Sequence, residues 1–176
     1  LFFDYDAHQT NLGKSDDGDV INQMLESFDN ETENGKLYIS YPMVEALRDF
    51  EAGKCGNEDN CFVEISDLAE YKNISSRNSL NLHFRDYNID VWKEIIDVFS
   101  MRISCLLGNA EVISYEQYLD EANPHDIFMC EQALAGNNKG FIISAFPEFL
   151  VDYFGMKLWK TCVKHAKNQL DICNCK

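Results

Sequence analysis

The chain has 176 residues, 45% of them hydrophobic, which is enough for one domain with a sizeable core. Thirty acidic residues against fifteen basic ones give a net charge of -15, which disfavours tight nonspecific binding to polyanions unless local basic clusters or metal ions assist. No apolar stretch approaches the roughly 20 residues needed to span a bilayer, and no basic leader precedes the first expected strand, so we expect a soluble, cytoplasmic protein without membrane contact.

The first six residues, Leu-Phe-Phe-Asp-Tyr-Asp, predict a buried strand that ends in two acidic side chains, Asp4 and Asp6. Open α/β sheets bind ligands and ions at the carboxyl ends of their strands, so both carboxylates are candidate metal ligands. Because Leu1 already lies inside the expected strand and is not an initiator methionine, we also expect an upstream segment that contributes a further strand.

A second strand, expected at 37–39, repeats this arrangement. The apolar residues at 20–28 recur at the spacing of an amphipathic helix, which would connect the two strands in parallel. Ser40 ends the second strand, and Pro42 suits the first turn of a following helix. Glu45 would then lie about one turn inside that helix, near the same edge of the sheet.

Asp4, Asp6 and Glu45 are therefore expected to converge on one point. Three clustered carboxylates repel one another unless a divalent cation lies between them, and hard oxygen ligands suit Mg²⁺ or Mn²⁺. A metal site formed by these three residues is the leading hypothesis.

The middle of the chain gathers the basic side chains. A short strand is expected at 61–65 and a helix from 66 to about 71, followed by a polar segment at 72–88 with weak periodicity. This segment contains only one acidic residue and is the best candidate for contact with a phosphate group, although a plain surface loop is the simpler interpretation. Its candidate phosphate-contacting residues are Arg77, His83 and Arg85.

The back half of the chain is expected to be mostly helical. Amphipathic patterns predict helices at 90–107, 115–121 and 124–134, the second of them with a capping box formed by Ser114 and Gln117. A late strand is expected at 141–143, followed by one last helix from 144 toward 168. No linker or repeat divides the sequence, so residues 1–176 are expected to form a single α/β domain. The aromatic residues of the last helix are expected to pack in the core. They are Phe146, Phe149, Tyr153 and Phe154.

Seven cysteines are spread along the sequence. An odd number in a domain of this size predicts reduced thiols of a cytosolic protein rather than a disulfide framework. Zinc stays an alternative, because Cys55 with Cys61 and Cys173 with Cys175 could supply four sulfur ligands, although neither pair has the C-x2-C spacing of the usual zinc knuckles.

The segment F-F-D-Y-D, followed about 30 residues later by S-Y-P-M-V-E, resembles the DxD segment and the following strand-Ser-x-Pro-helix of Toprim-like nucleases. The RloB-type and OLD-type proteins of bacterial anti-phage systems are the nearest in kind, and the resemblance covers about the first 50 residues. It implies a Rossmann-like parallel sheet flanked by helices, with magnesium bound by Asp4 and Asp6, and it supports the same role less strongly for Glu45. In such relatives a glutamate on an earlier strand helps catalysis. The resemblance further implies nucleic acid as substrate. For an inactive, degenerate domain of this kind, the partner would be an ATPase or another defence component.

Two alternatives stay open. A fold of the aspartyl-phosphate kind also begins with an apolar strand and DxD, where Asp4 would be the nucleophile and Asp6 a general acid. That chemistry also needs a hydroxyl residue closing the second strand and a later lysine, for which Ser40 and Lys139 are the candidates. The other alternative is an inactive, acidic module that binds a protein partner in a larger complex. Whether the chain is an enzyme is left open by its sequence.

Overall fold

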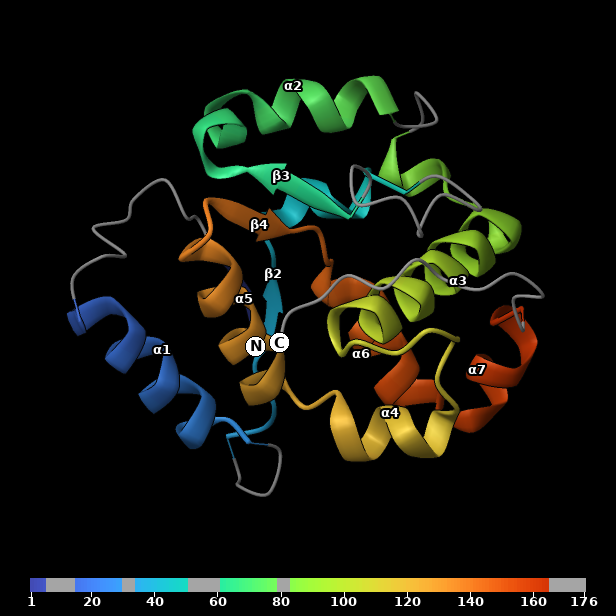
Figure 1. Cartoon of the computed structure of the whole chain (residues 1–176). Helices are drawn as coiled ribbons and strands as arrows, with labels where there is room; N and C mark the ends of the chain where they lie inside the picture. Colours follow the sequence, from blue (N-terminus) through green and yellow to red (C-terminus); the bar gives the residue numbers. More distant parts are fainter. Residues whose placement is uncertain (6–14, 30–33, 51–60, 79–82, 165–176) are drawn as a thin grey trace.

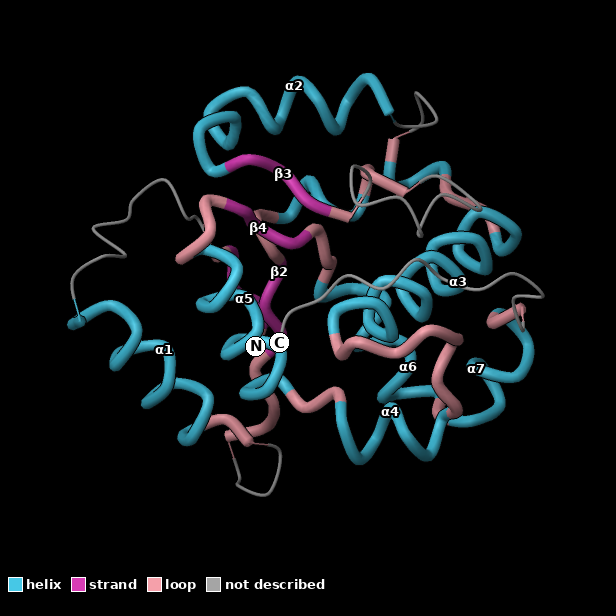
Figure 2. Tube along the Cα trace, in the orientation of Figure 1, coloured by secondary structure: helices cyan, strands magenta, loops and turns pink. Residues whose placement is uncertain are grey.

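The computed structural model describes residues 1–5, 15–29, 34–50, 61–78 and 83–164. Within these residues the chain is mixed α/β, with short strands near its centre and helices around them (Figure 1). Figure 2 shows the same arrangement coloured by secondary structure, and the back half is mostly helical, as the sequence predicts.

The first two strands are parallel. β1 (Phe2–Asp4) pairs with β2 (Tyr38–Ser40), and α1 (Ser15–Ser27) lies between them in the sequence. The register aligns Asp4 with Ser40, so both residues lie at the end of the sheet that we call the carboxyl edge. The predicted β-α-β order with parallel strands is confirmed, whereas the prediction that the first strand is buried is wrong, because Phe2 and Phe3 are exposed.

The other two strands are antiparallel. β3 (Phe62–Glu64) pairs with β4 (Lys139–Phe141), and a single bridge between Tyr41 and Ile143 connects this pair to β2. The predicted late strand thus begins two residues earlier than expected. The described residues thus form two separate two-stranded sheets, one parallel and one antiparallel, and the bridge joins them through the residues that follow β2 and β4.

The segment after Pro42 differs from its prediction. It forms the short 3-10 helix η2 (Val44–Leu47) in place of an α-helix. The chain leaves this helix at Arg48 because Asp49 and Phe50 turn into the core, where both are buried. Glu45 therefore lies in a single tight turn.

The predicted polar segment is helical over its first part. The 3-10 helix η4 (Ile65–Asp67) leads into α2 (Leu68–Asn78), which is about two turns longer than expected. The 3-10 helix η5 (Phe84–Asp86) follows. The interpretation of residues 72–88 as a plain loop is wrong for the part of α2 that it includes.

Three predicted helices of the back half are confirmed. They are α3 (Ile89–Leu106), α4 (Tyr115–Glu121) and α5 (Pro124–Ala135). Each begins at a side-chain cap, because Asn88, Ser114 and Asn123 accept hydrogen bonds from backbone N–H groups of the first turn. The capping box of Ser114 and Gln117 is formed in both directions.

The last helix is divided in two. α6 (Ala145–Phe154) ends at Gly155, and α7 (Met156–Cys162) begins directly after it. Gly155 has φ +65°, a left-handed conformation that glycine adopts readily, so the helix cannot continue through it. The prediction of one continuous helix is wrong at this residue.

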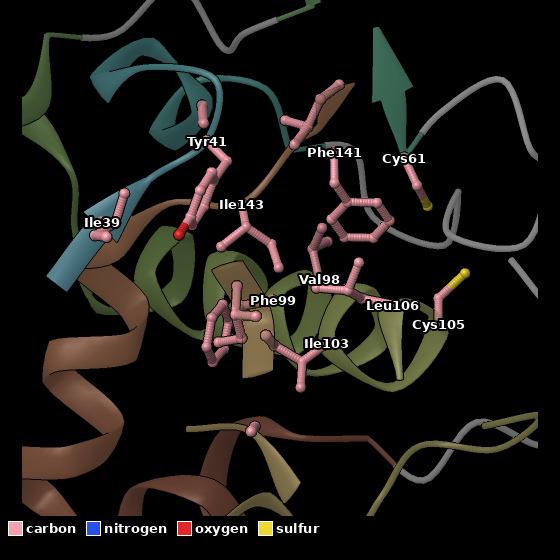
Figure 3. Close-up of a cluster of buried hydrophobic side chains, with 14 of the residues drawn as sticks. Ile39, Tyr41, Cys61, Val98, Phe99, Ile103, Cys105, Leu106, Phe141 and Ile143 are labelled. Atoms are coloured by element: carbon pink, nitrogen blue, oxygen red, sulfur yellow. The ribbon is translucent and has the colours of Figure 1, made fainter. Parts of the chain in front are cut away.

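The core lies between the strands and α3. Figure 3 shows Ile39, Tyr41 and Ile143 facing Val98 and Phe99 of α3. Cys105 takes part in a disulfide, so the prediction of reduced thiols is wrong at this position, whereas Cys162 is a free thiol. No described helix is long and apolar enough to cross a membrane.

Candidate functional site

The carboxyl edge of the β1–β2 sheet holds the first predicted metal ligand. Asp4 is exposed at the end of β1, beside the buried Ser40, and the backbone N–H of Tyr5 donates to the Ser40 carbonyl at 3.0 Å. The ladder therefore continues one residue beyond Asp4 and fixes its position at the edge. Asp6 lies outside the described residues.

Ser40 connects this edge to α6. Its hydroxyl accepts a hydrogen bond from the Ala145 backbone N–H at 3.2 Å, and the Ser144 hydroxyl accepts from the N–H of Phe146. The start of α6 thus lies at the carboxyl edge, with two of its first N–H groups already satisfied. Ser40 is 2% exposed, so its hydroxyl acts here as a structural acceptor.

Lys139, the other residue named for aspartyl-phosphate chemistry, has its own contact. It begins β4, and its ammonium lies 5.3 Å from the centre of the Phe62 ring on the paired strand. The described contacts do not join Lys139 to Asp4 or Ser40.

Glu45 lies in η2 and is half-buried. Its carboxylate is 3.4 Å from the ammonium of Lys72 on α2, and the Lys72 side chain is 72% exposed. One turn further on, the Arg48 guanidinium lies 4.7 Å from the centre of the Phe84 ring. Through these two contacts η2 joins the predicted acidic site to the predicted basic segment.

The candidate phosphate-contacting residues lie close to this junction in sequence. His83 and Arg85 are exposed and flank Phe84, and Arg85 Nε is 3.6 Å from the carboxylate of Asp86. Arg77 belongs to α2, but its side chain lies outside the described residues. Sequence reasoning did not name Lys72 or Arg48 as site residues, although Arg48 lies one helical turn after Glu45 and Lys72 begins the segment 72–88.

The donor chemistry of the predicted metal ligands suits a hard cation. Asp4 and Glu45 offer carboxylate oxygens only, as Mg²⁺ and Mn²⁺ prefer. Among the described residues no group of three metal-binding side chains gathers, and that search does not include Asp6. Of the predicted zinc ligands, Cys55, Cys173 and Cys175 also lie outside the described residues.

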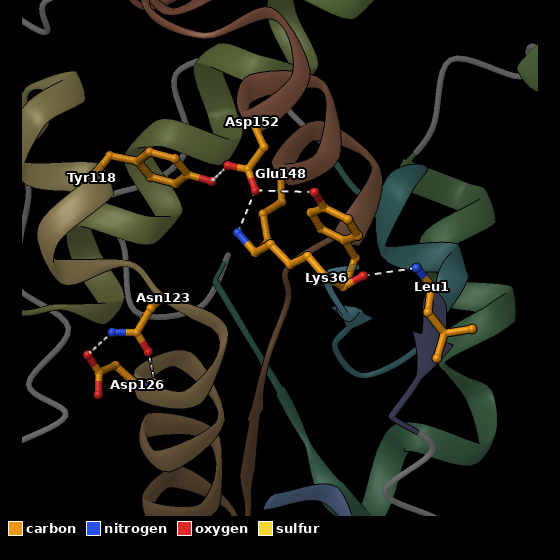
Figure 4. A network of polar contacts seen from close by, with 8 residues as sticks. Leu1, Lys36, Tyr118, Asn123, Asp126, Glu148 and Asp152 are labelled. Carbon is orange, nitrogen blue, oxygen red and sulfur yellow. Dashed lines mark hydrogen bonds and ion pairs between the residues drawn. The ribbon is translucent and has the colours of Figure 1, made fainter. Parts of the chain in front are cut away.

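The opposite end of the sheet, which we call the amino edge, holds a polar network that the sequence did not reveal (Figure 4). The Asp152 carboxylate of α6 forms an ion pair with Lys36 and accepts hydrogen bonds from Tyr38 at 3.3 Å and Tyr118 at 3.0 Å. The carboxylate of Glu148, one helical turn earlier, lies 3.4 Å from the Lys36 ammonium. These five residues connect β2, α4 and α6.

Burial governs the protonation of this amino-edge network. Burial raises the pKa of Glu148 to about 7, although the Lys36 ammonium acts in the opposite direction. Burial alone would lower the pKa of Lys36, but the carboxylates of Glu148 and Asp152 outweigh it and raise that pKa. The one available signal was the pair of acids four residues apart in the otherwise apolar segment F-P-E-F-L-V-D-Y-F.

A second buried network holds Asp49, which follows η2. Tyr71 donates a hydrogen bond to Asp49 at 3.1 Å, and the Arg102 guanidinium lies 3.9 Å from the same carboxylate. Arg102 also donates to the Ile142 carbonyl at 3.1 Å. Asp49, two residues after η2, is thus linked to α2 through Tyr71 and to α3 through Arg102, which also contacts the residue after β4.

Comparison with known proteins gives no relative: no protein-family model, no curated protein and no solved structure matches the chain.

Proposed function

We propose that the chain is a Toprim-like, metal-dependent phosphodiesterase domain that acts on nucleic acid, with Asp4, Asp6 and Glu45 as ligands of Mg²⁺ or Mn²⁺. The observation that carries this proposal is the parallel pairing of β1 and β2, which aligns Asp4 with Ser40 at the edge of the sheet that leads into η2. In open α/β proteins this edge is where ligands bind.

A metal held there would activate water and neutralise the charge that develops on a phosphate. The protein's part is to hold its oxygen ligands in place before the substrate arrives. β1 fixes Asp4 through backbone hydrogen bonds to β2, and η2 holds Glu45 through the buried anchor of Asp49. The substrate-side residues would be Lys72 and Arg85, whose side chains are both largely exposed.

The local charge supports nucleic acid as the substrate in spite of the net charge of -15. The Lys72 ammonium contacts Glu45 of η2, and the Arg48 guanidinium contacts Phe84 of η5, the neighbour of Arg85. These contacts bring basic side chains to η2 and η5. A positive patch beside a metal ion lowers the repulsion that a polyanion would otherwise meet.

The proposal places the domain in bacterial anti-phage defence, with an ATPase or another defence component as its partner. The support is the resemblance of F-F-D-Y-D and S-Y-P-M-V-E to RloB-type and OLD-type proteins.

The test is a cleavage assay on plasmid DNA, single-stranded DNA and RNA, each with Mg²⁺ or Mn²⁺ and with EDTA. We expect metal-dependent cleavage that is lost in Asp4→Asn, Asp6→Asn. The matched control is Asp120→Asn, Glu121→Gln, which removes two exposed carboxylates from α4 and should cleave as wild type does. Cleavage that persists in the Asp4/Asp6 variant would overturn the proposal.

A small-molecule arm separates the alternatives. Hydrolysis of p-nitrophenyl phosphate without nucleic-acid cleavage would favour aspartyl-phosphate chemistry. Inactivity on every substrate, from a protein that melts cooperatively, would leave the acidic protein-binding module.

A further inference from the structure

A cavity of about 380 Å³ lies between α3, α6 and α7. Each helix presents residues at helical spacing to it, such as Trp92 and Ile96 on α3, Phe146 and Phe149 on α6, and Leu158 and Cys162 on α7. The volume is within the range of small-molecule sites and far larger than the voids that close-packed interiors tolerate.

The cavity opens to solvent on one side. Its floor is buried, with Ile96 at 1% and Cys162 at 2% exposure, whereas Ile89 and Phe154 at its entrance are more than half exposed. A ligand could therefore enter between these two residues and lose contact with water at the floor.

The wall formed by α6 is held in place by stacked rings. Phe146 stacks on Phe2 of β1 with ring centres 5.0 Å apart, and Phe149 meets the same ring edge-on at 5.5 Å. These contacts fix the two phenylalanines from behind, so the wall does not depend on an occupant for its shape. A preformed apolar cavity requires little reorganisation on binding.

Charge selects the occupant. Lys93 is the one ionisable side chain besides the Cys162 thiol among the described residues that line the cavity. Burial raises the pKa of that thiol; the Lys93 ammonium, which lines the cavity, lowers it, and the Asp97 carboxylate, which does not line the cavity, raises it. The ion-pair partner of Lys93 is Asp90 at 3.1 Å, which is 79% exposed, and such surface pairs are weak enough to exchange for a ligand.

We propose that this cavity binds an amphiphilic anion, with an apolar chain of about a dozen carbon atoms between α3, α6 and α7 and a carboxylate against Lys93. The chain length follows from the volume at roughly 30 Å³ for each heavy atom, which exceeds what one side chain of a protein partner would fill. The site uses none of the residues assigned to phosphodiester hydrolysis, so the two proposals stand or fall separately.

The probe is dodecanoate, titrated calorimetrically into the protein below its micellar concentration, beside dodecyltrimethylammonium and hexanoate. The net charge of -15 favours the cation everywhere else on the surface, so preference for the anion is diagnostic of this site. We expect saturable binding of one dodecanoate, with the cation and the shorter acid each at least tenfold weaker.

Three variants localise the binding. Leu158→Trp fills the cavity and should abolish binding while the protein melts no lower than wild type, which separates loss of the site from loss of the fold. Lys93→Met should weaken dodecanoate about tenfold, the effect of one charge-assisted contact. Lys157→Met, an equal charge change at an exposed residue of α7 that does not line the cavity, should bind as wild type does.

The proposal is overturned if dodecanoate shows no saturable binding or if Leu158→Trp binds it as tightly as wild type. Equal or tighter binding of the cation would also overturn it, because the occupant would then be selected by apolar contact alone.

Discussion

The two edges of the β1–β2 sheet use their charges differently. At the amino edge Lys36, Glu148 and Asp152 are largely buried, and Asp152 alone accepts from three donors. At the carboxyl edge Asp4 is exposed, and the partner of Glu45 is a lysine that is 72% exposed.

This contrast separates stability from ligand binding. Buried polar and charged groups that contact one another hold β2, α4 and α6 together, and loss of one of them leaves its partners buried without that contact. Charges at an open edge contribute little to folding, and it is to this edge that the proposed function assigns the binding of an ion or a substrate. α6 connects the two edges, because Ala145 at its start contacts Ser40 and Asp152 near its end contacts Lys36.

The largest expected effect is at the amino edge. Asp152→Ala removes the shared acceptor of Tyr38 and Tyr118 and leaves Lys36 with Glu148 as its only carboxylate in this network. We expect the free energy of unfolding to fall by about 3–5 kcal/mol, as for other broken buried ion pairs. Denaturant unfolding followed by circular dichroism measures it.

The matched control is Asp120→Ala on α4, whose side chain is exposed. It should change the free energy of unfolding by less than about 0.5 kcal/mol. Similar losses in both variants would mean that the amino-edge network contributes no more than a surface charge does.

The second effect is a pH dependence at the same edge. The folded protein holds the Glu148 proton up to a pKa of about 7, whereas the unfolded chain releases it near the ordinary value of 4.5. Because the folded-state pKa is raised, this stabilisation is fully present below about pH 4.5 and is lost as the pH rises through about 7. It amounts to roughly 3 kcal/mol at about 1.4 kcal/mol for each pH unit.

Glu148→Gln isolates this contribution, because glutamine keeps the shape but does not titrate. The difference in unfolding free energy between wild type and Glu148→Gln should decrease steadily between pH 5 and pH 8. Two parallel stability curves over this range would show that Glu148 ionises as it does in the unfolded chain.

A smaller effect is expected at the carboxyl edge on adding metal. A cation that binds only the folded state adds RT ln(1 + [L]/Kd), about 1.4 kcal/mol at tenfold excess over Kd. For a domain of this size that is a rise of about 4 °C in melting temperature with Mg²⁺ or Mn²⁺, measured by calorimetry.

The control is Asp4→Asn, Asp6→Asn. Without metal it should melt no lower than wild type, because clustered carboxylates repel one another, and it should ignore the metal. Equal rises in melting temperature in both proteins would mean that the metal only screens the net charge, and would contradict the proposed metal site.

The parts of the fold that could be predicted are those with local causes. The capping box of Ser114 and Gln117 acts within one helical turn, so it can be recognised in a single sequence. The helix break at Gly155 could not be predicted in this way, because a lone glycine in an apolar helical pattern does not by itself indicate a positive φ.

Long-range pairing explains the other failures. Lys36 and Asp152 meet across 116 positions, and neither residue carries a local signal of its partner. The direction of β4 is likewise set by its pairing with β3 and not by the apolar pattern F-I-I that predicted a strand. For the candidate site, the sequence pointed to Asp4 at a strand end and to Glu45 just after the next strand, but Lys72 is recognisable only once α2 lies against η2.

The smallest expected change in stability concerns the ion pair of Glu45 and Lys72. Lys72 is largely exposed, so Lys72→Met should alter the free energy of unfolding by less than about 0.5 kcal/mol, in contrast to Asp152→Ala. The same substitution should have a clear effect on the affinity for Mg²⁺. If Glu45 ligates the ion, the Lys72 ammonium competes for the same carboxylate, so its removal should tighten Mg²⁺ binding by a few-fold, whereas Glu45→Gln should weaken it. Titration calorimetry with Mg²⁺ on both variants distinguishes the roles. Unchanged affinity in both would confine Glu45 to its ion pair and leave Asp4 and Asp6 as the only ligands from this part of the chain.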